Sequence, residues 1–294
     1  MPSLFDIEKE NESRTIITKY VKKLHEKTKR NVIIYYSGWL SVPHNLPVEI
    51  NDMDKNGFMA MCHGLNVEKG LDLILHTPGG DVAATESIID YLRTMFKGDI
   101  RAIIPQLAMS GGTMIACSCK EIIMGKQSSL GPVDPQINGV PAHGVLSEFE
   151  LAKKDIEENI NHVPLWQPII RKYNPTFIGS CQRAIEWSNE ILQTSLKNNM
   201  FKDDENSAKI DKIIDVLGSP KDTKHHNRHL NPDKCKELGL KVTSMEKDNE
   251  EQDLILSIHH ACMSLFNRSN VFKIFANQNN NFLNFKYNTE SSNN

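Results

Sequence analysis

The chain has no long run of apolar residues. None of its 294 residues lies in a window approaching the roughly 18 consecutive apolar residues that a membrane-spanning helix needs. The N-terminal segment, residues 1–10, is charged and lacks the apolar stretch of a secretory signal peptide. We therefore expect a cytoplasmic protein without a membrane anchor.

An excess of positive charge and paired cysteines are also missing. The formal net charge is −3, so no general basic field for nucleic acid is expected. The 6 cysteines are scattered without C-x-x-C spacing, which argues against a zinc site and favours a reduced, intracellular protein. No G-x-G-x-x-G sequence follows a strand pattern, which argues against a dinucleotide cofactor. We predict neither a metal nor a cofactor.

Short apolar runs alternate with helical patterns in the first half of the chain. Strands are predicted at 31–36, 71–76, 100–105 and 121–124, and helices at 14–29, 51–62, 81–96 and 110–118. Such alternation is typical of parallel βαβ units, so the predicted class is α/β.

The pattern becomes mainly helical after a loop at 125–141. Helices are predicted at 143–161, 165–173, 176–201, 210–217 and 254–266, with a short strand at 239–242. The segment from 278 onward is rich in Asn and Ser, which favours disorder. The resulting division is an N-terminal helix (1–30), a core (31–160), a helical C-terminal extension (161–267) and a disordered tail (268–294).

Two glycine-containing turns follow consecutive predicted strands. They read His76-Thr-Pro-Gly-Gly-Asp81 and Ala108-Met-Ser-Gly-Gly-Thr113. The N–H groups of Gly80 and Gly111 can form an oxyanion hole, Gly79 can shape the turn, and Ser110 can supply an attacking hydroxyl. Each turn by itself also fits an ordinary strand-to-helix connection, and a serine is a common helix N-cap. The two together favour acyl-transfer chemistry.

A third segment, Ser129-Leu-Gly-Pro-Val-Asp-Pro-Gln136, completes a resemblance to a known family. The three motifs resemble the serine dehydrogenase proteinase family, a branch of the Clp/crotonase superfamily related to signal-peptide peptidase A. The resemblance is strong over 30–160 and extends to about 267. It implies a Clp/crotonase-like spiral of ββα units, a homo-oligomer and serine peptidase activity on peptides or proteins. It also implies Ser110 as the nucleophile, with Gly80 and Gly111 as the oxyanion donors.

The base that activates the serine is less clearly marked. Where Clp proteases have a catalytic histidine, this chain has Asp134, which argues against a Ser-His-Asp triad. Relatives of signal-peptide peptidase A use a lysine from a later helix, which makes Lys153 and Lys154 candidates. Lys153 falls on the apolar stripe of the predicted helix, where desolvation would free its amine lone pair, so it is preferred.

Other polar residues near the motifs are secondary candidates. His76 and His143 are alternative bases or substrate contacts, and Asp134 can orient a base or serve as a turn residue. The remaining histidines of the second half are interpreted as surface or interface residues: His225, His226, His229, His259 and His260.

Two other functions stay open beside a serine endopeptidase with a Ser110–Lys153 dyad. A crotonase-type enzyme acting on an acyl thioester would use the same two N–H groups but would not need a nucleophilic serine. A catalytically inactive scaffold would keep the fold and the oligomer.

Overall fold

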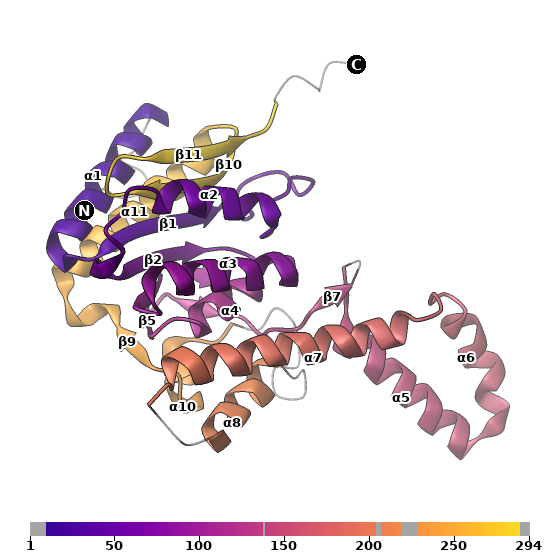
Figure 1. The fold of residues 1–294 in the computed structure, drawn as a ribbon. Coiled ribbons are helices and arrows are strands. Elements are labelled where there is room, and N and C mark those ends of the chain that lie inside the picture. The colour runs from indigo at the N-terminus through magenta and orange to yellow at the C-terminus, as the bar shows by residue number, and fades with distance from the viewer. Residues whose placement is uncertain (1–9, 138, 204–206, 219–228, 289–294) are drawn as a thin grey trace.

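A mainly parallel sheet of 7 strands forms the centre of the computed structural model, which describes residues 10–137, 139–203, 207–218 and 229–288. The strand order is β11-β10-β1-β2-β3-β5-β9 (Figure 1). The parallel strands are β1 (Asn31–Ser37), β2 (Leu71–His76), β3 (Ile100–Ile104), β5 (Glu121–Met124) and β9 (Val242–Ser244). At one edge β10 (Val271–Asn277) runs antiparallel to β1, and β11 (Phe282–Lys286) runs antiparallel to β10.

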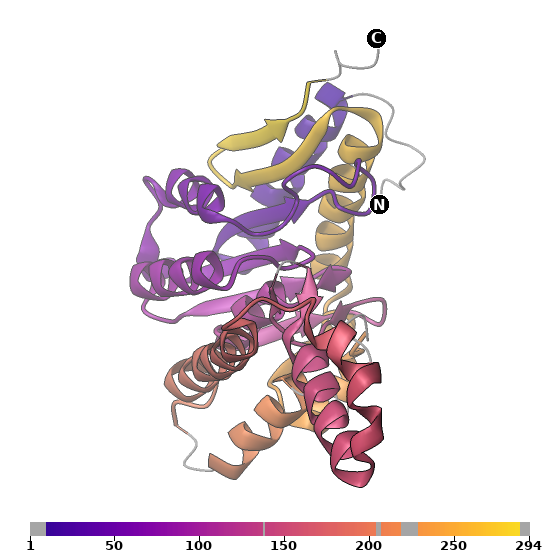
Figure 2. The same cartoon turned by 90° about the vertical axis from the view of Figure 1, so that its right-hand side faces the viewer.

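Helices cover both faces of the sheet (Figures 1 and 2). One face carries α1 (Glu10–Thr28) and α11 (Asn249–Arg268), and the other carries α2 (Asp52–Cys62), α3 (Val82–Phe96) and α4 (Gly111–Cys117). All 7 residues of β1 are buried. Ile33 and Tyr35 enter one core and Ile34 and Tyr36 the other, as strand alternation between two covered faces requires.

A second, shorter set of strand pairings lies beyond the carboxyl ends of the main strands. Here β4 (Leu107–Ala108) pairs with β6 (Ser129–Leu130), and Thr77 bridges Ala108. Gly80 bridges Ile50 on one side. Each unit thus gives a long strand to the main sheet, a short strand to the second set, and then a helix. The predicted α/β fold built from ββα units is confirmed.

Three helices form an arm that extends away from the sheet (Figure 1). They are α5 (Ala142–Glu158), α6 (Val163–Ile170) and α7 (Phe177–Ser195), and a short hairpin of β7 (Gln136–Ile137) and β8 (Val140–Pro141) precedes them. The C-terminal end of α7 packs on the core, near α8 (Ser207–Gly218) and α10 (Pro232–Leu238). Exposed apolar side chains gather on the arm: Leu151, Ile160, Val163, Leu165, Ile169, Ile170, Ile178 and Trp187.

The C-terminal segment differs from the predicted disordered tail at 268–294. Strand β10 is buried along its whole length between β1 and β11. Strand β9 and helix α11, which fall in the predicted extension at 161–267, complete the sheet and one of its covering layers. One partner of β10, strand β1, lies near the start of the chain, so the local Asn-rich composition did not reveal this pairing. Residues 1–9 and 289–294 lie outside the described part.

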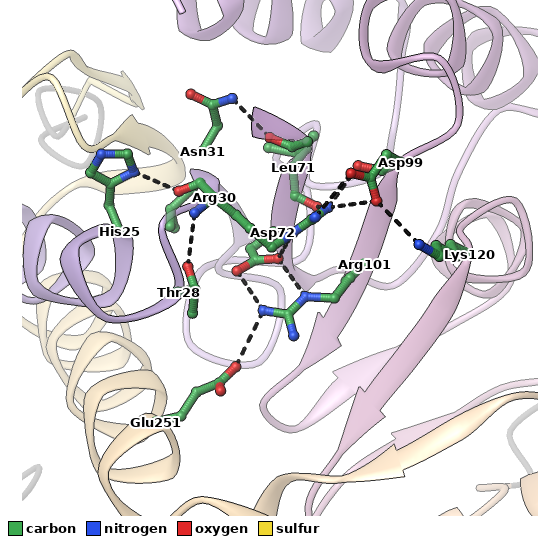
Figure 3. Close-up of polar contacts among 12 residues, drawn as sticks. His25, Thr28, Arg30, Asn31, Leu71, Asp72, Asp99, Arg101, Lys120 and Glu251 are labelled. Atoms are coloured by element: carbon green, nitrogen blue, oxygen red, sulfur yellow. Dashed lines mark hydrogen bonds and ion pairs between the residues drawn. The ribbon is translucent and has the colours of Figure 1, made fainter. Parts of the chain in front are cut away.

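A buried carboxylate ties together the amino ends of three adjacent strands (Figure 3). Asp72 accepts from Nε of Arg30 at 2.8 Å, and from Nε and Nη2 of Arg101, both at 2.7 Å. Arg30 also donates to Asp99, and this hydrogen bond holds the pKa of Asp99 below its usual value. Because charge-assisted bonds are directional, the network fixes how β1, β2 and β3 align.

Replacement of Arg101 tests how much this network contributes to the stability of the fold. Arg101→Met leaves the fully buried Asp72 with one guanidinium partner, so we expect the free energy of unfolding to fall by about 2–4 kcal/mol. Chemical denaturation measures this change. Lys97→Met is the control, since it removes only an exposed pair with Glu68 and should change stability by less than about 1 kcal/mol. Equal losses in the two variants would contradict a structural role for Asp72.

Candidate active site

Ser110 lies in a strained turn between β4 and α4. Its φ is 49° and its ψ is −112°, a backbone conformation that residues with a Cβ rarely adopt. The turn is closed by the N–H of Gly112, which donates to the carbonyl of Met109 at 2.8 Å. Ser110 is the N-cap residue of α4, yet its side chain makes no capping hydrogen bond. This geometry favours a nucleophile over a simple helix cap.

The turn that carries Gly79 and Gly80 packs directly on Ser110. Gly79 has a φ of 94°, and a Cβ at this position would lie 2.6 Å from the Cβ of Ser110 and 2.8 Å from the nitrogen of Gly111. At Gly80 a Cβ would collide with the backbone of Ile50. Only glycine allows both backbones to approach this closely. The two predicted turns are therefore in contact.

Two backbone N–H groups are available beside the serine. A Cβ on Gly111 would lie 3.4 Å from the nitrogen of Gly80, so the two glycine backbones are neighbours. Neither N–H donates a hydrogen bond within the described ranges, whereas the N–H of Gly79 donates to Thr77 Oγ1. Helices α3 and α4 begin at these turns, and the positive ends of their dipoles favour negative charge. Two such donors side by side can stabilise a negatively charged oxygen.

These groups border a cavity of about 850 Å³. Its wall includes Ser110, Gly79, Gly80 and Asp134. Among the described lining residues there is no Lys or Arg; the charged ones are carboxylates, with one imidazole, His229. Much of the remaining wall is apolar: Trp39, Leu40, Leu107, Met109, Met114, Pro132, Val133 and Trp187. A cavity of this size can hold a short peptide segment.

Lys153 and Lys154 are both exposed on α5, and neither lines the cavity. The buried residues of α5 are Ala142, Val145 and Ala152. The expectation that Lys153 is desolvated is therefore wrong for the single chain. The reason is that α5 packs on α7 mainly through residues of its first half, including Val145 and Phe149, and the positions of Lys153 and Lys154 remain exposed.

His76 lies behind the cavity, not on its wall. It is fully buried, its Nδ1 donates to the carbonyl of Ser37 at 3.1 Å, and its Nε2 meets the side-chain amide of Gln106 at 3.1 Å. The ring stacks on Tyr36. Burial lowers the pKa of His76 from 6.5 to about 4. Because both nitrogens are occupied, His76 supports the end of β2 and is poorly placed to take a proton from the serine.

Asp134 is one of the carboxylates on the cavity wall, and His229 is the imidazole among the described lining residues. Asp134 is buried in the loop after β6. His229 is exposed beside the cavity because its neighbour Leu230 exchanges two hydrogen bonds with Leu130, at 2.8 and 3.0 Å. No sequence motif identifies His229 as a cavity residue. It reaches the cavity through the pairing of Leu130 with Leu230, which are far apart in the sequence. His143 lies on α5 away from the wall.

Neither a metal-binding cluster nor a membrane-spanning helix is found in the described part of the chain. There, no group of three or more His, Cys, Asp or Glu side chains is arranged to hold a metal ion. Within the same ranges, no helix combines the length and the apolar character needed to span a bilayer. His225 and His226 lie outside the described residues.

Comparison with known proteins agrees with this geometry. Residues 7–264 match the family described as ClpP-like SDH-type serine proteinase. The chain belongs to this family. The match confirms the family resemblance that the three sequence motifs indicate.

Two uncharacterized proteins of Methanocaldococcus jannaschii are similar to this ClpP-like chain. One is 34% identical over 174 residues, which cover 59% of this chain and 52% of the relative. The other is 31% identical over 175 residues, which cover 60% of this chain and 54% of the relative. The chain thus spans about half the length of the curated relatives that it matches.

Acid is expected to destabilise this ClpP-like protein through His76. The unfolded chain takes up a proton at His76 near pH 6.5, whereas the folded chain resists protonation down to about pH 4. The free energy of unfolding should be independent of this group above pH 6.5. It should then fall by about 3 kcal/mol as the pH drops from 6.5 to about 4. Denaturant unfolding across this range measures the slope.

The His76→Gln variant should show a smaller slope over the same range. Some slope remains, because burial also lowers the pKa of His259. His44→Gln is the matched control, since His44 is exposed, and it should keep the wild-type slope. A wild-type slope in His76→Gln would show that another group takes up the proton.

Proposed function

We propose that this chain hydrolyses peptide bonds with Ser110 as the nucleophile. The proposal rests on one observation: the strained Ser110 turn lies against the N–H groups of Gly80 and Gly111 at one cavity. Membership of a family described as serine proteinases supports it. The peptide substrate, a homo-oligomer and a cytoplasmic location remain predictions.

The reaction follows from the placement of these groups. Ser110 Oγ attacks the carbonyl carbon of the scissile peptide, and the N–H groups of Gly80 and Gly111 hold the oxygen that becomes negative. A base takes the hydroxyl proton and delivers it to the departing amine. Water then hydrolyses the acyl ester left on the serine. Each preorganised oxyanion donor contributes roughly 100- to 1,000-fold to the rate of such reactions.

A thioester enzyme of the crotonase kind is a weaker candidate. It would use the same two N–H groups, but it would leave the strained serine without a role. Strain at a residue with a Cβ persists only where the surrounding structure enforces it, and it is concentrated at functional sites. The conformation of Ser110 therefore favours the peptidase.

Removal of the Ser110 hydroxyl tests the proposed peptidase directly. Ser110→Ala should reduce casein hydrolysis by at least about 1,000-fold, because no other group can form the acyl ester. A fluorophosphonate probe should label wild type at Ser110, as read by peptide mass spectrometry, and should not label the variant. Ser147→Ala, at an exposed position of α5, should behave as wild type. Equal hydrolysis by wild type and Ser110→Ala would reject this mechanism, and no turnover with a stable oligomer would favour the scaffold.

The base is proposed to be a lysine of α5 that a second copy of the chain brings to the cavity, with Lys153 preferred to Lys154. A lysine acts as a base when it is desolvated, and in the single chain both lysines are exposed. The arm that carries them also exposes many apolar side chains, which a second copy would cover. His229 is the alternative, because it lines the same cavity as Ser110 within one chain.

Co-expression of two inactive variants distinguishes these bases. Lys153→Met and Ser110→Ala should each be inactive alone, whereas oligomers containing both should regain activity, because some sites receive an intact serine and an intact lysine. His229→Gln should then keep most of the wild-type activity. An active Lys153→Met variant together with an inactive His229→Gln variant would instead assign the base to His229. Lys154→Met, processed in parallel, controls for the loss of a neighbouring charge.

A further inference from the structure

Lys273 and Asp54 form a buried ion pair between β10 and α2. The Nζ of Lys273 lies 2.8 Å from Oδ2 and 3.0 Å from Oδ1 of Asp54, and the side chains are only 2% and 1% exposed. Tyr35 donates its hydroxyl to the same carboxylate at 3.0 Å. Burial lowers the pKa of Lys273, and Asp54 opposes this shift. Apolar residues of similar size often stabilise a core as well as a buried pair does, so stability alone does not account for these charges.

The pair holds residues 48–51, here called the bracket segment, from one side. The ammonium of Lys273 donates to the carbonyl of Glu49 at 2.6 Å. The carboxylate of Asp54 accepts from the backbone N–H of Asn51 at 3.0 Å, as part of the capping box that begins α2. Two polar groups of the bracket segment are thus fixed by side chains that solvent does not reach.

The bracket segment holds the Gly79–Gly80 turn from its other side. The N–H of Ile50 donates to the carbonyl of Gly79 at 2.7 Å, and the carbonyl of Ile50 accepts from the N–H of Asp81 at 2.9 Å. The backbones of Ile50 and Gly80 are so close that no Cβ fits between them. The bracket segment therefore lies between the buried ion pair and the turn that lines the cavity.

One peptide group transmits this constraint to the oxyanion donor. The carbonyl of Gly79 and the N–H of Gly80 belong to the same planar peptide unit, and in a trans peptide they point in opposite directions. The described chain contains no cis peptide bond. When Ile50 fixes the Gly79 carbonyl, it also fixes where the Gly80 N–H points. A rotation of this peptide would turn the donor away from Ser110.

We infer that Lys273 is a positioning residue for the Gly80 oxyanion donor, an inference that rests on the proposed function of that donor. Lys273 does not touch the cavity and acts through Glu49 and Ile50. An apolar side chain could fill the same space, but it could not fix the direction of a backbone carbonyl, because only a hydrogen-bond donor does so. The strand that carries Lys273 thereby becomes part of the catalytic architecture.

The test uses the double variant Lys273→Met/Asp54→Asn in the full chain. It leaves no buried charge unpaired, and Asp54→Asn keeps an oxygen that accepts from Asn51, so the protein is expected to fold. Val21→Ala is the control for general destabilisation, because Val21 is buried on α1 against the opposite face of the sheet. Circular dichroism identifies an assay temperature at which wild type and both variants are folded.

Two readouts follow, one independent of catalysis. Hydrogen exchange at the amides of Ile50 and Asp81 should be at least about tenfold faster in the double variant than in Val21→Ala at matched global stability. The kcat for peptide hydrolysis should fall about 10- to 100-fold with KM within about twofold, since the donor acts on the oxyanion that forms in the transition state. Val21→Ala should keep the wild-type kcat.

The outcomes separate this inference from the proposed function. Exchange no faster than in Val21→Ala would overturn the inference, whatever the enzyme does. Faster exchange with an unchanged kcat would overturn it as well, because the turn would then loosen without effect on the donor. If wild type neither hydrolyses peptides nor reacts with the fluorophosphonate, the proposed function fails. The exchange result would still decide whether Lys273 holds the turn.

Discussion

The contact between two turns is the constraint on which the site depends. Gly79 lies so close to Ser110 that a single additional carbon would collide with it, and the amide of Gly80 lies beside Gly111. This closeness places a hydroxyl and two N–H groups at one point of the cavity wall. It also holds Ser110 in a conformation that a free chain would avoid. The placement of these groups is therefore set by backbone positions, and the side chains around them provide support.

The two ends of the sheet are organised differently. At the amino ends of the strands, Asp72 and its two arginines tie neighbouring strands together far from the cavity. At the carboxyl ends, short strand pairings carry the two glycine turns, and a cavity lies beside them. Ligand sites in α/β sheets form at the carboxyl ends of the strands, where connecting loops can vary without disturbing the core.

The single chain brings Ser110 beside the N–H groups of Gly80 and Gly111, but the lysines expected to activate the serine are exposed. They lie on an arm whose apolar surface has no partner within the described chain. Large exposed apolar surfaces commonly mark contacts with other proteins. The exposed lysines and the exposed apolar residues lie on the same arm. Both observations are explained if a second copy of the chain covers the arm and receives a lysine from it. His229 offers a different solution within one chain, so the location of the base is a question about quaternary structure.

The sequence by itself determined strands β1, β2, β3 and β5, the two glycine turns and the family, because these features are carried by neighbouring residues. Strand periodicity and the φ > 0 that Gly79 adopts are local properties. Only the tertiary structure decided that β10 is a buried strand, that His229 reaches the cavity and that Lys153 is exposed. The first two depend on pairing between distant segments, and the third on which face of α5 meets α7. Sequence periodicity identifies an apolar stripe but does not identify the surface that covers it.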